Sequence, residues 1–241
     1  MHRSDSVARL ALVGAMQEEL SAVLALMQDA SCETVAGRQF WRGQLNGHAV
    51  VAVLSGIGKV AAAMTATVLI EKFQVERILF TGVAGGLAAH VRVGDVVVAS
   101  ELLQHDMDAS PLFPQYEVPL SGRARFEADP VMTQVLIESV QQVLPQVQVH
   151  AGLVISGDQF VSSASESRRL QMEIADALAV EMEGAALAQV CRDYGIPLAV
   201  VRTLSDRADD DAHTDFSKFV KDVASHYSVA IVCEFLRRQA T

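Results

Sequence analysis

The chain has 241 residues, of which 51% are hydrophobic and 20% are charged, a balance typical of a folded globular protein. This length suits one large domain with a full core, and we find no repeat, linker or low-complexity tract. The formal net charge of −10 argues against a nucleic acid as partner. We therefore expect a single domain over residues 1–241, with a short flexible N-terminus at residues 1–8.

The apolar run Leu10–Met16 follows two arginines, as in a signal peptide, but it is short and soon meets two glutamates. We interpret it as a buried first strand. No apolar run reaches the length of a membrane-spanning helix, so we expect no membrane partner. The three cysteines lie far apart without metal or redox spacing, which favours a reducing, cytoplasmic location.

The first part of the chain predicts a strand, a helix and a hairpin. Leu10–Val13 is expected as the strand, and the apolar spacing from Leu20 to Met27 predicts the helix. Glu33–Leu45 and His48–Leu54 are expected as two strands of a hairpin, because an Asn-Gly pair joins them.

Two glycine-rich stretches follow. Ser55–Lys59 (SGIGK) precedes an alanine-rich helix expected over Val60–Phe73, but it lacks the glycine and Ser/Thr positions of a P-loop. Arg77–Thr81 is predicted as a strand that ends in Gly82–Gly86, whose glycines do not have Rossmann spacing. This bare backbone either approaches a ligand or forms a plain structural turn.

The next segment, after a strand expected over Val96–Ser100, contains a histidine and aspartates at His105–Asp108. No second cluster of His or Cys supports a metal site there, and we expect no metal. Ala109–Gly122 holds three of the six prolines, so we interpret it as an irregular loop. Its apolar side chains suggest a partner surface or a pocket wall.

The second half continues the alternation of strands and helices. Asp129 and Pro130 predict the start of a helix. Val147–Ile155 is expected as a strand, and Ser163–Met172 and Phe216–Tyr227 as helices. Such alternation predicts an α/β fold: a single three-layer domain with a mostly parallel sheet.

Two apolar runs near the end, Leu178–Val180 and Leu198–Leu204, each lead into acidic residues. A helix is expected between them at Ala185–Tyr194, because a Gly-Ile-Pro sequence ends it. Open α/β sheets place ligands at the carboxyl ends of their strands. We therefore predict a ligand site around Glu183 and Asp206, although Asp206 taken alone is more simply a cap for the following segment.

Six short motifs occur in one order along the chain: GAMQEE at 14–19, SGIGK at 55–59, TGVAGG at 81–86, SGDQF at 156–160, VEMEG at 180–184 and LSD at 204–206. This set resembles the 5′-methylthioadenosine/S-adenosylhomocysteine nucleosidases of the nucleoside phosphorylase superfamily. The resemblance implies a twisted mixed central sheet flanked by helices, a homodimer and no cofactor. It also implies hydrolysis of the N-glycosidic bond of methylthioadenosine, adenosylhomocysteine and often 5′-deoxyadenosine, which yields adenine and the sugar.

The resemblance also implies roles for individual residues. By motif position, Glu19 matches the base for the attacking water, Asp206 the acid at the purine and Glu183 the residue that holds the ribose hydroxyls. Phe160 matches the aromatic ring that stacks on adenine, and the backbone of Val161 matches the one that reads the base edge. Ser205 should orient Asp206, and Arg202 should help to hold the water site. The other residues expected at the substrate are Met16, Ile57, Val83, Ala84, Gly85, Glu181, Met182 and Phe216. The residues expected in the 5′-pocket of a neighbouring subunit are Ala109, Leu112, Phe113 and Pro119. Val83 departs from the family, which often has serine there.

The chemistry explains why two kinds of carboxylate are needed. Adenine leaves easily only when its N7 is protonated, and a carboxylic acid is protonated at neutral pH only where its surroundings raise its pKa. Asp206 follows an apolar strand, which favours a desolvated position. A carboxylate at Glu183 would stabilise the cation-like sugar, and Glu19 would take the proton of the water, as in an inverting glycosidase.

Three alternatives stay open. A nucleoside phosphorylase would need an arginine-based phosphate site, whereas TGVAGG carries no arginine and GAMQEE carries acids. A futalosine-type nucleoside hydrolase would share the fold. A nucleoside-binding module would bind the ligand tightly without turnover.

Overall fold

The computed structural model describes residues 9–14, 17–209, 212 and 225–239. Along the chain, the helices and strands are β1 (Leu10–Gly14), α1 (Gln17–Leu24), β2 (Gln28–Val35), β3 (Arg38–Leu45), β4 (His48–Leu54), α2 (Lys59–Glu71), β5 (Arg77–Gly86), β6 (Val96–Gln104), β7 (Arg125–Glu127), α3 (Pro130–Val143), β8 (Val149–Ser156), α4 (Ala164–Glu173), β9 (Ala177–Glu181), α5 (Gly184–Tyr194), β10 (Leu198–Asp206) and α7 (Ser225–Gln239). Within these ranges no helix combines the length and the apolar character needed to cross a membrane.

The strands form one mixed sheet in the order β10-β6-β8-β9-β5-β1-β4-β3-β2, with β7 paired to β6. Among the described strands, half of the pairings are parallel, including β1 with β4, β1 with β5 and β5 with β10. The additional pairing of β10 with β5 closes β5, β10, β6, β8 and β9 into a ring. This mixed sheet agrees with the family resemblance.

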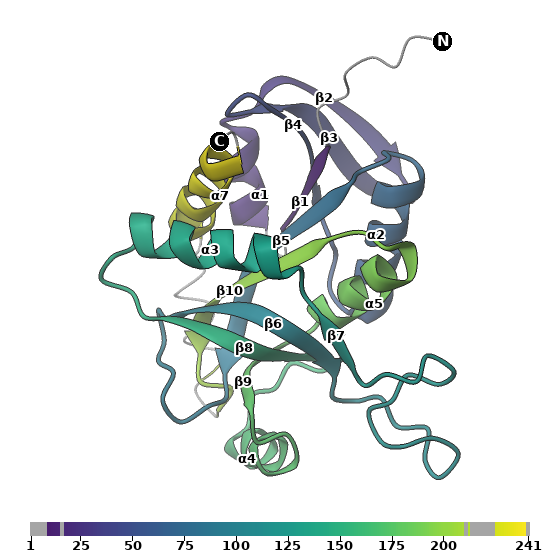
Figure 1. Cartoon of the computed structure of the whole chain (residues 1–241). Helices are drawn as coiled ribbons and strands as arrows, with labels where there is room; N and C mark the ends of the chain where they lie inside the picture. Colours follow the sequence, from purple (N-terminus) through teal and green to yellow (C-terminus); the bar gives the residue numbers. More distant parts are fainter. Residues whose placement is uncertain (1–8, 15–16, 210–211, 213–224, 240–241) are drawn as a thin grey trace.

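Helices cover the sheet on two faces (Figure 1), as expected for a three-layer α/β fold. Helices α2 and α5 pack together on one face, where Ala66 and Leu187 are fully buried. Helices α1, α3 and α7 cover the other face through Leu20, Leu136 and Phe235. Helix α4 packs beside β8 and β9 over a third apolar cluster. The predicted α/β class is confirmed.

Several local signals were interpreted correctly. The Asn46-Gly47 pair turns the chain between β3 and β4, with positive φ at both residues. Asp129 caps α3 by accepting a hydrogen bond from the Met132 N–H at 2.8 Å. Gly195, with φ +68°, ends α5 in the left-handed conformation.

Several predicted strands had the wrong bounds. The strand predicted over Val96–Ser100 continues to Gln104 in β6. Glu33–Leu45 is not one strand, because a turn at Ala36 and Gly37, both with positive φ, separates β2 from β3. The strand predicted over Arg77–Thr81 continues to Gly86, because the glycines of TGVAGG pair with neighbouring strands instead of turning. The helix predicted over Phe216–Tyr227 lies mostly outside the described residues.

Candidate functional site

The pairing of Gly85 brings the two acidic strand ends to one place. In the sheet, Gly85 of β5 is opposite Val180 of β9 on one side and opposite Asp206 of β10 on the other. Neighbouring strands lie roughly 5 Å apart, so the ends of β9 and β10 are separated by about 10 Å at this level. β9 ends at Glu181, two residues before Glu183, so Glu183 and Asp206 lie at the same edge of the sheet.

Asp206 is buried, with 2% of its surface exposed. The Ser205 hydroxyl donates to its Oδ2 at 2.8 Å, and the Ala208 N–H donates to its Oδ1 at 2.8 Å. A Cβ added at Gly85 would lie 2.9 Å from Oδ1 of Asp206 and 3.0 Å from the Ala208 side chain. Because Gly85 has no side chain, the Asp206 carboxyl can lie directly against its backbone.

Glu183 is also buried, in the turn between β9 and α5. Its Oε1 accepts a hydrogen bond from the backbone N–H of Gly58 at 2.9 Å, so the SGIGK turn lies directly against it. Burial raises the pKa of the Glu183 carboxyl to about 7, the neighbouring charge of Glu181 adds to the rise, and the Gly58 N–H opposes it. Glu183 therefore changes charge near neutral pH.

This raised pKa predicts a pH-dependent stability. The folded state keeps a proton on Glu183 that the unfolded state releases above about pH 4.5, so the free energy of unfolding falls as the pH rises towards 7. The glutamine of Glu183→Gln does not titrate, so its free energy of unfolding does not fall in this way. The free energy of unfolding of Glu183→Gln minus that of wild type should therefore rise by about 3 kcal/mol between pH 4.5 and pH 8. Urea denaturation at the two pH values measures it. The exposed Glu76→Gln is the control, and a difference between Glu183→Gln and wild type that stays constant with pH would contradict the assignment.

Glu181 and Arg202 form a buried ion pair beneath this edge. Arg202 Nη2 lies 2.7 Å from Glu181 Oε2, and the two side chains are 0% and 3% exposed. Glu181 also accepts from the Ser156 hydroxyl and from the Gly184 N–H at 2.9 Å, which ties it to the start of α5. The Arg202 guanidinium lies 3.8 Å from the centre of the Phe80 ring. The pair thus supports the turn that carries Glu183, and the binding roles expected of both residues stay predictions.

The other predicted residues fall into three groups. Those in or near the strand ends differ in exposure: Val83, Ala84 and Val161 are buried, Met182 is half-buried, and Phe160 and Ile57 are exposed. The residues expected in a partner's pocket lie on the segment between β6 and β7: Ala109, Leu112, Phe113 and Pro119. Outside the described part lie Met16, Phe216 and the side chain of Glu19, whose backbone belongs to α1.

Sequence reasoning missed several residues that support the site. Ser156 and Asp158 lie within SGDQF, and Gly58 and Lys59 lie within SGIGK, but only Phe160, Val161 and Ile57 were chosen from these motifs and their flanks. For Ser156 and Asp158, the signal available was a polar side chain at or just after the end of a strand. Their partners lie up to 125 residues away in the chain, so the pairings were not readable from the sequence.

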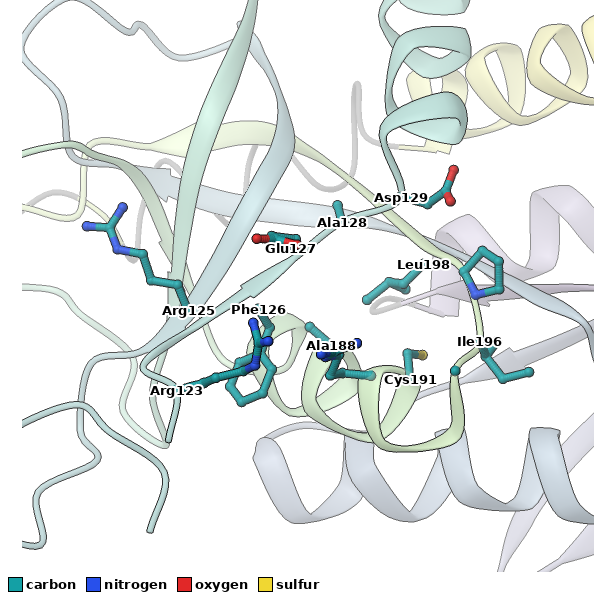
Figure 2. A pocket seen from close by; sticks show the side chains of 13 residues that line it. Arg123, Arg125, Phe126, Glu127, Ala128, Asp129, Ala188, Cys191, Ile196 and Leu198 are labelled. Atoms are coloured by element: carbon teal, nitrogen blue, oxygen red, sulfur yellow. The ribbon is translucent and has the colours of Figure 1, made fainter. Parts of the chain in front are cut away.

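A separate cavity of about 270 Å³ lies between β7 and α5 (Figure 2). Phe126 of β7 and Ala188 and Cys191 of α5 contribute to its lining. Burial raises the pKa of the Cys191 thiol to about 12, so this thiol is a poor nucleophile. None of the predicted site residues is among the described residues that line this cavity. We therefore place the candidate site at the strand edge around Glu183 and Asp206.

The family follows from comparison with known proteins. Residues 9–237 match the family model described as "Phosphorylase superfamily", and the chain belongs to this superfamily. A 5′-methylthioadenosine/S-adenosylhomocysteine nucleosidase of Bacillus thuringiensis subsp. konkukian is 38% identical over 93% of this chain and 96% of its own length.

The solved structures that share the fold of this chain include two enzymes with different names. The nucleosidase of that name from Neisseria meningitidis, in complex with methylthio-immucillin-A, superposes with a TM-score of 0.91 at 32% identity, over 95% of this chain and 99% of its own. A futalosine hydrolase of Helicobacter pylori superposes with a TM-score of 0.90 at 32% identity, over 98% of this chain and 100% of its own.

Proposed function

We propose that this protein is a nucleosidase that hydrolyses the N-glycosidic bond of 5′-methylthioadenosine and S-adenosylhomocysteine, and also that of 5′-deoxyadenosine. The products are adenine and the corresponding sugar. The observation that carries the proposal is the buried Asp206 carboxyl, seated against the bare backbone of Gly85 at the sheet edge that also holds Glu183. The 38% identity to a nucleosidase over nearly the whole chain supports the choice of substrate.

In the proposed mechanism, Asp206 is the acid that protonates N7 of the purine, and Ser205 orients it through the hydrogen bond to Oδ2. Glu183 holds the ribose hydroxyls and stabilises the positive charge that develops on the sugar. Glu19 accepts the proton of the attacking water. Phe160, which is 42% exposed, stacks on adenine, and the backbone of Val161 binds the base edge.

Water rather than phosphate is the proposed nucleophile. A phosphate site would need arginine side chains available to the anion. Arg202 is buried and paired with Glu181, and Arg38, beside the SGIGK turn, donates to the backbone carbonyls of Ser55 and Ala36. These arginines already have partners, which favours hydrolysis.

An assay of adenine release tests the proposal. With methylthioadenosine in phosphate-free buffer, we expect steady release of adenine at a rate that added phosphate does not change. Strict dependence on phosphate would instead indicate a phosphorylase, and tight binding of the nucleoside without release would indicate a binding module. Both results would contradict the proposal.

The futalosine hydrolase of similar structure makes a second substrate class worth measuring. We expect the kcat/KM for methylthioadenosine and adenosylhomocysteine to exceed that for futalosine, because the 38% identical relative is a nucleosidase of the former class. A reversed order in the same assay would assign the protein to the second class.

We also propose a homodimer in which one subunit completes the 5′-pocket of the other through Ala109, Leu112, Phe113 and Pro119. Leu112 and Leu120 on the segment between β6 and β7 are 84% and 92% exposed, and Val60 on the first turn of α2 is 79% exposed. Such apolar groups suit a protein–protein contact. A cytoplasmic location is proposed as well, and the three free cysteines support it.

A further inference from the structure

Helix α2 begins without a side-chain cap of its own. Its N-cap residue is Gly58, which cannot offer a side-chain acceptor, and yet two carboxylates occupy the end of the helix. Glu183 accepts from the Gly58 N–H at 2.9 Å, and Asp158 accepts from the Lys59 N–H at 2.7 Å. Both carboxylates suit the positive end of the helix dipole. Two adjacent amides of one turn therefore bind two acids that follow different strands, β8 and β9.

Asp158 is itself held by a ring of contacts. Its backbone N–H donates to Asp106 Oδ2 at 2.9 Å, while the Lys59 ammonium lies 2.6 Å from Asp106 Oδ1. Lys59, Asp106 and Asp158 are thus each joined to the other two. The Lys59 ammonium also donates to Gln104 at 3.1 Å, and Gln104 donates to Gln189 of α5 at 2.8 Å. This ring links the start of α2 to the ends of β6 and β8.

The backbone at Gly58 lies in close contact with Asp158. Gly58 has φ +90°, a conformation that residues with a side chain rarely adopt, and a Cβ there would lie 2.9 Å from Asp158 Oδ1. The carboxylate of Asp158 thus lies against the turn and holds the amide next to the one that Glu183 uses. The Gly58 N–H and the Lys59 N–H belong to consecutive peptide units of this turn, so the two carboxylates bind neighbouring amides.

We propose that Asp158 is a positioning residue for Glu183, acting through the Gly58–Lys59 turn, with Asp106 and Lys59 holding Asp158 in place. This proposal rests on the proposed function, in which Glu183 binds the ribose. With Asp158 in place, the Gly58 N–H points at Glu183 Oε1 and limits where that carboxylate lies. Without it, the turn relaxes and Glu183 loses its backbone donor.

The first test compares two substitutions at Asp158. Asp158→Ala removes the acceptor for the Lys59 N–H, and we expect kcat/KM for methylthioadenosine to fall about 10- to 100-fold, as for other misplaced binding groups. Asp158→Asn keeps an acceptor oxygen at the same place and should restore most of the activity. Asp129→Ala is the control, because it removes a carboxylate that accepts from a first-turn amide of another helix, α3, away from the site. This control should lose stability without losing kcat/KM.

A double-mutant cycle separates positioning from a direct role. In a Glu183→Ala background, the turn has no carboxylate to orient, so Asp158→Ala should change kcat/KM little. Thermal unfolding of each variant shows whether it is folded. If Asp158→Ala does not fold, Asp106→Ala replaces it in the test, because it removes the contacts that hold both Asp158 and Lys59. We expect Asp106→Ala to lower kcat/KM as well.

The outcomes distinguish this proposal from the proposed function. A wild-type protein that releases no adenine contradicts the proposed function. An active wild type with an equally active Asp158→Ala, an Asp158→Asn as impaired as Asp158→Ala, or fully additive losses in the cycle would each overturn the positioning role alone.

Discussion

Asp206→Asn is expected to lower kcat for adenine release by about 10²- to 10⁴-fold while the affinity for the nucleoside changes little, because the variant removes a general acid. Asparagine has nearly the same shape and keeps an oxygen that accepts a hydrogen bond, so it preserves a contact with Ser205 or the Ala208 N–H. Its amide does not transfer a proton to the purine. The measurement is the single-turnover rate alongside the nucleoside dissociation constant.

The burial of Asp206 is the reason to expect a large loss of rate. Asp206 is 2% exposed, so in Asp206→Asn a water molecule does not readily take its place as the proton donor to the purine. The matched control is Asp193→Asn, an exposed aspartate on α5, which should keep the wild-type rate. A rate for Asp206→Asn within a few-fold of wild type would remove Asp206 from the role of acid and leave it as a structural cap.

Arg202→Met is expected to lower the free energy of unfolding by about 3–5 kcal/mol, because it leaves a buried carboxylate without its counter-charge. In the wild type, Glu181 and Arg202 are paired at 2.7 Å with almost no exposure to water. Removing the guanidinium also removes its contact with the Phe80 ring. Urea denaturation at pH 7 measures the change.

The control for this prediction is an ion pair at the surface. Arg125→Met breaks the contacts of Arg125 with Asp176 and Glu101, whose side chains are 59% and 37% exposed, and it should cost clearly less than Arg202→Met because water screens these charges. Adding Glu181→Gln to Arg202→Met should recover part of the lost stability, since the unpaired charge is then gone. A loss near that of the surface control would mean that the buried pair contributes little.

Local signals predicted most elements of the fold. The Asn46-Gly47 turn, the Asp129 cap and the Gly195 stop depend on the conformation of one or two residues, so they can be read from the sequence. Predictions of strand bounds were less accurate where the bounds depend on pairing with a neighbouring strand. The glycines after Thr81 resembled a turn, but they continue β5 because β9 and β10 pair with them.

For the candidate site, the sequence identified the residue types but not their arrangement. Glu181 and Glu183 lie two positions apart in one motif, and both are acidic residues after an apolar strand. In the fold they have different partners: Glu181 pairs with Arg202, and Glu183 binds the Gly58 N–H. Those partners are 21 and 125 residues away, so no local pattern separates the two glutamates.

The sequence by itself determined the α/β class, most of the helices and strands, and the family, because these follow from apolar periodicity, turn residues and six motifs in order. Only the tertiary structure decided that Gly85 lies between β9 and β10 beside Asp206, and that Asp158 and Glu183 share the first amides of α2. The physical reason is that strand pairing and helix ends bring together groups that are distant in the chain. The hydrogen bonds that orient the acids exist only after that pairing.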